Sequence, residues 1–509
     1  MKVRAPNARV GVVVVHGIGE QRRFEHVDGQ VRELVRALGA RPGARVTTEI
    51  ASARSGAFGA SADSWESSCP VRVFVDEGGH LTQIEFHEVW WADVNEPYSL
   101  GKQFRFWAWS LSIWAYPGKV AEARPYSRSM MPAATVGGRL TRWWTRTRLV
   151  GVALVAVLIA ATVGLVAFFA ERLFKIETPR ILQTFVNYLS GVKLYNQKRR
   201  RGRGLPSKEE DFLDAIGDPP RTSVRRRMIR TLMSVAEERY DRWYVLAHSL
   251  GTVVAFNGLM MPAEVWPGYF ERDAWERARN AATPLAGTAG PEWPPPPPGR
   301  FQPHRPVWAG AREIALRSKI FERLHGVVTF GSPLEKFAAI WPANVWLSRE
   351  AAFRPGTEWI NVFDPTDPVS GVLTAFSGGQ PDCCPVPRNL GFAAGPWLLV
   401  SHLRYLRESR AREGLADGIA EWLLSGSSAR IGVGQDWFIP RGSRFWRRTA
   451  LAWTSWGLVV AILTVAAALL FGKALGSLRS EECRIERTLH QNGIRWPDTH
   501  CEPAGRKTP

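Results

Sequence analysis

Short runs of apolar, mostly β-branched residues recur along the chain, each followed by small or polar residues. The unbroken run at 10–15, Val-Gly-Val-Val-Val-Val, is typical of a strand buried on both faces of a parallel sheet. Further runs of this kind lie at 243–246, 327–330, 359–363 and 397–400. Between 224 and 240 the apolar residues recur with helical spacing, which predicts a helix leading into the run at 243–246. The pattern predicts an α/β fold with a mostly parallel sheet flanked by helices.

A serine stands where one of these predicted strands turns into a helix. The segment Ala247-His248-Ser249-Leu250-Gly251 connects the run at 243–246 to a helical stretch at 252–257. Such a turn strains the serine backbone and lifts the hydroxyl clear of the sheet edge. Small residues are needed two positions before and after the serine because strand and helix nearly touch there, and Ala247 and Gly251 meet this need. The alternative is an ordinary loop serine.

A glycine-containing loop, His16-Gly17-Ile18-Gly19, follows the first predicted strand. Its glycines allow backbone N–H groups to face a ligand. An oxyanion hole next to a serine turn of this kind uses the N–H after the nucleophile, here that of Leu250. A second N–H comes from an early loop, here that of Gly17 or Ile18. The alternative is a plain strand-to-loop turn.

These motifs resemble those of α/β-hydrolase serine lipases and esterases. The resemblance rests on the His-Gly-Ile-Gly loop, the His-Ser-Leu-Gly turn, the segment 327–333 and Asp367-Pro368-Val369. It covers residues 8–20 and 225–410, and intracellular phospholipase-like hydrolases are the most similar type. The resemblance implies an α/β-hydrolase-type sheet, a serine nucleophile and no cofactor.

The same resemblance implies a catalytic triad in the chain order serine, acid, histidine. Three histidines follow the candidate acids, and two of them, His490 and His500, lie beyond a predicted membrane span, so His402 is the candidate base. Asp367 is the favoured acid because of its Asp-Pro-Val context and its place in the loop after the run at 359–363. Asp364, at the end of that run, is the alternative acid.

The chain is strongly basic, with 66 Lys and Arg against 47 Asp and Glu and a formal net charge of +19. Basic residues gather before two long apolar segments and at 198–201. Next to a membrane segment they contact anionic lipid headgroups, at about 1 kcal/mol each. We expect a membrane and not nucleic acid as the partner, because no nucleic-acid-binding motif accompanies the charge. The five cysteines match no zinc spacing, and the alternation at 86–93 indicates a strand with a solvated polar face instead of a metal site at His87 and Glu88. No metal is expected.

The two apolar segments, 149–170 and 449–472, contain no charged residue, and about 20 residues suffice to cross a bilayer. Because residues 8–20 and 240–402 must build one sheet, the first segment has to return or not cross. Three arrangements of the first segment meet this requirement. The segment pairs with the aromatic segment 104–116 as a hairpin, or it lies in the membrane interface, or it re-enters beside the second segment.

The second segment has no catalytic residue after it and is predicted to be a transmembrane helix. Four arginines shortly before it place the catalytic side in the cytoplasm. Cys483 and Cys501 follow it, and a disulfide between them outside the cytoplasm is consistent with this topology. The chain begins almost directly with its first strand, so no secretory signal is expected.

We therefore expect an integral membrane protein with one catalytic domain. The expected parts are a hydrolase domain at 1–440 with an insertion at 95–205 and a proline-rich insertion at 281–306, a transmembrane helix at 449–472, and a tail at 473–509. The expected function is hydrolysis of carboxylic esters, with lipid esters favoured by the membrane location. The alternative is a catalytically silent membrane scaffold of the same fold.

Overall fold

The computed structural model describes residues 5–17, 25–50, 71–91, 220–282, 314–340 and most of 351–451, with isolated residues elsewhere. The chain divides into two units. One consists of residues 1–150 and 180–452, and the other of residues 151–179 and 453–509. All the helices and strands named below belong to the first unit.

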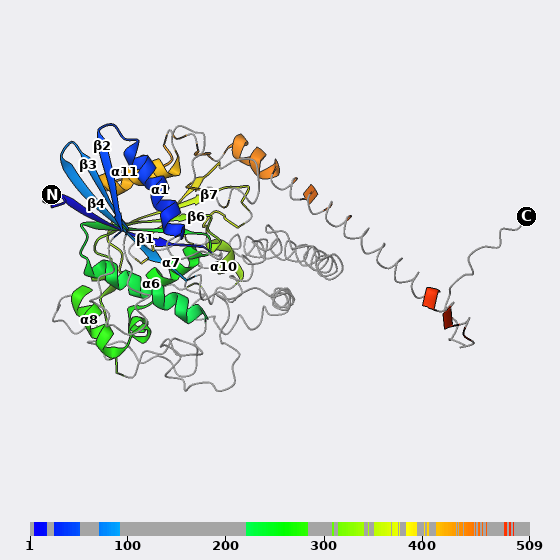
Figure 1. Ribbon diagram of the computed structural model, residues 1–509, viewed down its shortest axis with the longest axis horizontal. Helices are drawn as coiled ribbons and strands as arrows, with labels where there is room; N and C mark the ends of the chain where they lie inside the picture. The colour runs from blue at the N-terminus through cyan, green and yellow to red at the C-terminus, as the bar shows by residue number, and fades with distance from the viewer. Residues whose placement is uncertain are drawn as a thin grey trace, which may run out of the picture. The chain divides into compact units, whose positions relative to one another are not determined.

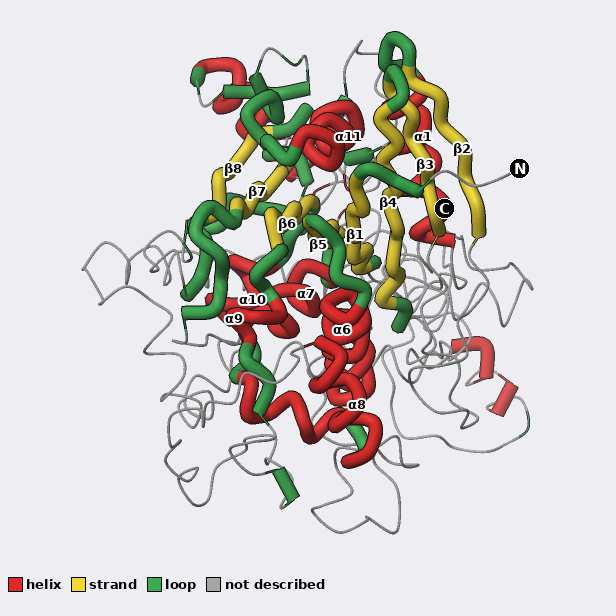
Figure 2. The backbone as a smooth tube through the Cα atoms, turned by 90° about the vertical axis from the view of Figure 1, so that its left-hand side faces the viewer, coloured by secondary structure: helices red, strands yellow, loops and turns green. Residues whose placement is uncertain are grey.

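The described part of the chain contains an eight-stranded sheet in the order β2-β3-β4-β1-β5-β6-β7-β8 (Figures 1 and 2). The strands are β1 (Ala8–Val15), β2 (Ala44–Ile50), β3 (Val71–Glu77), β4 (His80–Val89), β5 (Arg242–His248), β6 (Leu324–Phe330), β7 (Glu358–Phe363) and β8 (Pro387–Gly391). β3 pairs antiparallel with β2 and β4, and the other neighbouring pairs are parallel. The predicted α/β class with a mostly parallel sheet is confirmed.

Helices cover both faces of this sheet (Figure 2). α1 (Glu25–Gly39) and α11 (Leu415–Ser425) pack against each other on one face. The other face carries α6 (Pro220–Glu237), α7 (Gly251–Met260), the 3₁₀ helix η5 (Ala263–Tyr269), α8 (Arg272–Ala282), α9 (Arg317–Ile320) and α10 (Leu334–Ile340). α6 is the helix that the spacing at 224–240 predicts.

The composition of β1 follows from its central position between β4 and β5. Val13 and Val15 pack in the apolar cluster on the α6 and α7 side. Val12 and Val14 pack in the cluster on the α1 and α11 side. Successive side chains of a strand point to opposite faces, so burial on both faces requires the unbroken run of apolar residues.

β4 differs from its sequence-based prediction in the environment of its polar residues. His87 is 2 % exposed instead of solvated, and its Nε2 lies 2.7 Å from the Tyr240 hydroxyl. Tyr240 donates to the buried Glu85 carboxylate at 2.7 Å, and Arg72 contacts the same carboxylate at 3.2 Å. Glu85 tolerates burial because these partners satisfy its charge. Burial lowers the pKa of His87 to about 4, so the ring is neutral near pH 7.

Several sequence-based predictions fall outside the described residues. These are the insertion at 95–205 with its apolar segment 149–170, nearly all of the proline-rich insertion, and most of 449–472 and of the tail. In the parts of the chain that the structure describes, no helix combines the length and the apolar character that a membrane crossing requires. Cys483 is disulfide-bonded, while its predicted partner Cys501 is not among the described residues.

Candidate active site

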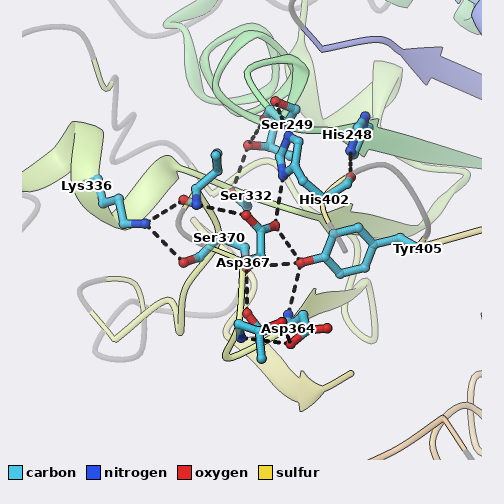
Figure 3. Close-up of polar contacts among 12 residues, drawn as sticks. His248, Ser249, Ser332, Lys336, Asp364, Asp367, Ser370, His402 and Tyr405 are labelled. Atoms are coloured by element: carbon cyan, nitrogen blue, oxygen red, sulfur yellow. Dashed lines mark hydrogen bonds and ion pairs between the residues drawn. The ribbon is translucent and has the colours of Figure 1, made fainter. Parts of the chain in front are cut away.

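The site lies where the parallel strands of the sheet end. β1, β5 and β7 are all parallel to their neighbours in the centre of the sheet, so their carboxyl ends meet at one edge. In open α/β sheets this edge is where ligands bind. Ser249 directly follows β5, and the segment 364–370 follows β7. His402 reaches the same place from further along the chain (Figure 3).

Ser249 has a backbone φ of +54°, which is uncommon for a residue other than glycine. Its N–H donates to the Phe330 carbonyl at 3.1 Å. Its own carbonyl accepts hydrogen bonds from the Thr252 N–H at 3.0 Å and the Thr252 hydroxyl at 2.7 Å. These contacts hold the residue in a strained conformation of the kind that occurs at functional turns.

Two glycines allow close backbone approach around this turn. A Cβ on Gly251 would lie 2.4 Å from the His16 carbonyl oxygen and 2.5 Å from that of Val15. A Cβ on Gly17 would lie 2.5 Å from the Cβ of Ser249. The predicted need for a small residue two positions after the serine therefore has a direct cause, because α7 begins against the end of β1.

Ser249, His402 and Asp367 form one continuous chain of hydrogen bonds. The Nε2 of His402 lies 2.9 Å from the Ser249 Oγ, and its Nδ1 lies 2.8 Å from Asp367 Oδ2 (Figure 3). The three residues are 2 %, 7 % and 4 % exposed, respectively. The structure thus brings together the three residues that the sequence predicts as nucleophile (Ser249), base (His402) and acid (Asp367).

Three hydrogen bonds hold the Asp367 carboxylate. Oδ1 accepts from the Val369 N–H at 2.8 Å, and Oδ2 accepts from the Tyr405 hydroxyl at 2.8 Å and from His402. Burial alone raises the pKa of a carboxyl group. The facing His402 ring and the three hydrogen bonds outweigh it and lower the pKa of Asp367 to about 2. The group is therefore ionised at neutral pH.

Asp364, the alternative acid, has a different set of contacts. Its Oδ1 accepts hydrogen bonds from the N–H and the hydroxyl of Thr366, both at 2.8 Å. Its carbonyl accepts from the Asp367 N–H at 3.0 Å. These contacts shape the turn that presents Asp367 to His402, and the geometry favours Asp367 as the acid.

His248 and Tyr405 are residues of the site that the sequence did not single out. The Nε2–H of His248 donates to the His402 carbonyl at 2.8 Å, and the two rings lie 4.9 Å apart. Burial, and then the neighbouring His402, lower the pKa of His248 to about 3, so its ring is neutral. His248 stands inside the serine motif, but nothing in the sequence shows that it contacts the loop of the base. Tyr405 has no sequence signal beyond its nearness to His402.

The predicted oxyanion hole is described in part. Leu250 directly precedes α7, so its N–H lies at the positive end of that helix. Gly17 lies beside Ser249, whereas Ile18 is outside the described residues. The Nε2 of His16 accepts from the Trp91 N–H at 3.0 Å, so its Nδ1 is the protonated nitrogen and donates to the Gly17 carbonyl at 2.6 Å. His16 thereby fixes the orientation of the Gly17 carbonyl next to the serine.

Across the described residues, no group of three His, Cys, Asp or Glu side chains is arranged to hold a metal ion. The chain matches no known family model, no curated protein and no solved structure.

Proposed function

We propose that this protein is a serine hydrolase of the α/β-hydrolase type that cleaves carboxylic esters. The observation that supports this best is the hydrogen-bonded chain from Ser249 through His402 to Asp367 at 2.9 and 2.8 Å. It is built on a strained strand-to-helix turn at the carboxyl edge of a mostly parallel sheet. The residues, their chain order and their roles match the logic of a Ser-His-Asp triad.

The reaction proceeds through an acyl-enzyme. The Ser249 Oγ attacks the ester carbonyl while the Nε2 of His402 takes its proton, and Asp367 stabilises the resulting imidazolium. The oxyanion of the tetrahedral intermediate accepts hydrogen bonds from the Leu250 N–H and from the loop at Gly17 and Ile18. The C–O bond to the alcohol then breaks, and the alcohol leaves with the proton from His402.

In the second half of the reaction, His402 takes a proton from water as that water attacks the acyl carbonyl. The second tetrahedral intermediate collapses, the bond to the Ser249 Oγ breaks, and the serine regains its proton from His402. The products are an alcohol and a carboxylic acid, which releases its proton to water at neutral pH. The mechanism requires no cofactor.

We further propose that the substrate is a lipid ester and that the enzyme is an integral membrane protein with its catalytic side in the cytoplasm. Exposed Arg444 and Arg447 flank Trp446, which is 65 % exposed, as expected at a surface with anionic lipid headgroups. Between them, the buried Phe445 packs on Phe363, the last residue of β7, with ring centroids 6.0 Å apart. The basic segment therefore begins at the edge of the sheet that carries the site.

A fluorophosphonate probe tests the enzymatic proposal, because it labels only a serine that the site activates. We expect wild-type protein to be labelled and to hydrolyse short-chain esters, and Ser249→Ala to lose both while remaining folded by circular dichroism. Ser427→Ala, at an exposed serine, is the matched control and is expected to react like the wild type. A folded wild-type protein that resists the probe would support the silent scaffold instead.

Membrane topology is a separate test. In a chain whose five native cysteines are replaced by serine, single cysteines at Asn7, Pro220 and Ser477 would be labelled with an impermeant maleimide in sealed vesicles. Asn7 and Pro220 belong to one sheet domain and should report the same side, while Ser477 should report the other. Opposite sides for Asn7 and Pro220 would contradict the single-domain interpretation.

A further inference from the structure

The Tyr405 hydroxyl contacts both Asp364 and Asp367 in the segment 364–370, which follows β7. Its oxygen lies 2.8 Å from Asp367 Oδ2, accepts a hydrogen bond from the Asp364 N–H at 2.9 Å, and lies 3.0 Å from the Ser370 Oγ (Figure 3). Tyr405 is 2 % exposed, and its ring lies 5.1 Å from that of Phe392. The phenol is thus held in place by packing as well as by hydrogen bonds.

The direction of these hydrogen bonds follows from donor and acceptor chemistry. A phenol has a single hydrogen, the Asp364 N–H can only donate, and the ionised Asp367 carboxylate can only accept. The phenol hydrogen therefore points to Asp367. The Ser370 hydroxyl donates to the Asp364 carbonyl at 3.2 Å, and its oxygen lies 3.0 Å from the phenol oxygen. Burial, and then the Asp367 and Asp364 carboxylates, raise the pKa of Tyr405 well above its ordinary value, so the phenol keeps its hydrogen.

Tyr405 and His402 bond to the same oxygen of Asp367. Two donors on one carboxylate oxygen compete for its negative charge. The two hydrogen bonds together fix the position of the carboxylate between the phenol and the imidazole. Resting on the proposed hydrolase function, we propose that Tyr405 is a positioning residue for the triad. Its phenol holds Asp367 against His402 and limits how strongly the carboxylate stabilises the protonated imidazole.

The test is the second-order rate of fluorophosphonate labelling of Ser249 in the full chain, measured against pH. For Tyr405→Phe we expect the plateau rate to fall about 10- to 100-fold, because a hydrogen bond to a charged group that orients the base is lost. We also expect the acidic limb of the profile to move to higher pH, since a carboxylate freed from the phenol stabilises the imidazolium more. A purely structural role would lower the rate without moving this limb.

A matched control and a second variant keep the result interpretable. Tyr244→Phe removes another buried phenol hydroxyl, which donates to the Trp422 carbonyl at 3.2 Å, and should leave the acidic limb in place. Substituting 3-fluorotyrosine for Tyr405 keeps every contact and makes the phenol a stronger donor. In that protein the limb should move to lower pH, even if Tyr405→Phe does not fold.

A double-mutant cycle identifies the residue through which Tyr405 acts. In an Asp367→Asn background, Tyr405→Phe should cause no further loss of rate, because the carboxylate that it positions is gone. An unmoved limb in the fluorotyrosine protein, or a full additional loss in the Asp367→Asn background, would overturn the proposal. Wild-type protein that is not labelled at all would contradict the hydrolase function itself, so the two failures are distinguishable.

Discussion

Replacing Gly251 by alanine tests whether close contact between α7 and β1 positions the nucleophile. The new methyl would lie 2.4 Å from the His16 carbonyl oxygen and 2.5 Å from that of Val15. Carbon and carbonyl oxygen normally approach to about 3.3 Å, so the overlap is about 0.9 Å. β1 is bonded to strands on both sides and cannot recede, so α7 has to move away. The shift displaces Ser249, which lies two positions before the first residue of the helix.

Two magnitudes follow from that displacement. Overpacking of this size lowers the free energy of unfolding by about 1–3 kcal/mol. A shift of about 1 Å in a reacting group lowers the rate about 10²-fold. Urea unfolding measures the first quantity and the rate of fluorophosphonate labelling measures the second.

The control for the Gly251→Ala variant is Gly29→Ala in α1, where an added Cβ meets nothing within 4 Å. This change should leave labelling unaltered and raise the free energy of unfolding by about 0.5–1 kcal/mol, because alanine favours a helix. If Gly251→Ala were labelled within threefold of the wild-type rate, close approach to β1 would not be what places the serine.

Two further predictions follow from the electrostatics of the site and of the sheet. Asp367→Asn should lower esterase turnover in steady-state kinetics roughly 10⁴-fold, whereas Asp364→Asn should lower it much less. The reverse ranking would assign the role of the acid to Asp364. His248 and His87 have folded-state pKa values of about 3 and about 4, below the ordinary value near 6.5, so the unfolded chain takes up protons first as the pH falls. The free energy of unfolding should therefore decline from pH 6.5 toward pH 4. Urea titrations of a His248→Gln, His87→Gln double variant should show a shallower decline, and an equal slope would refute this reasoning.

The centre of the sheet could be predicted from the sequence, and its edges could not. β1, β5, β6 and β7 are buried on both faces, so they appear as unbroken apolar runs. β2, Ala-Arg-Val-Thr-Thr-Glu-Ile, and β8, Pro-Arg-Asn-Leu-Gly, have no such run because edge strands need less apolar surface. The strand-like run at 397–400 lies outside the described residues.

The catalytic candidates were predictable for a different reason. Ser249, Asp367 and His402 could be identified because their order along the chain is set and because each follows an apolar run. Each of these criteria can be applied to a single position in the sequence. Tyr405 and His248 depend on how two loops meet in space. Their contacts join residues 38 and 154 positions apart, and no local pattern encodes such a meeting.

The pairing of β1 with β5 has a consequence for the synthesis of the protein. The Arg9 N–H donates to Asp241 at 2.7 Å across a sequence separation of 232 residues. At roughly 5–20 residues per second, a ribosome needs about 10–50 s to make the intervening chain. During that time one edge of an apolar strand that belongs in the middle of the sheet has no partner, and such edges promote aggregation. Non-local pairing also slows folding once β5 has emerged. The N-terminal strand should therefore be a client of chaperones during translation, and the yield of folded protein should depend on how long it is protected.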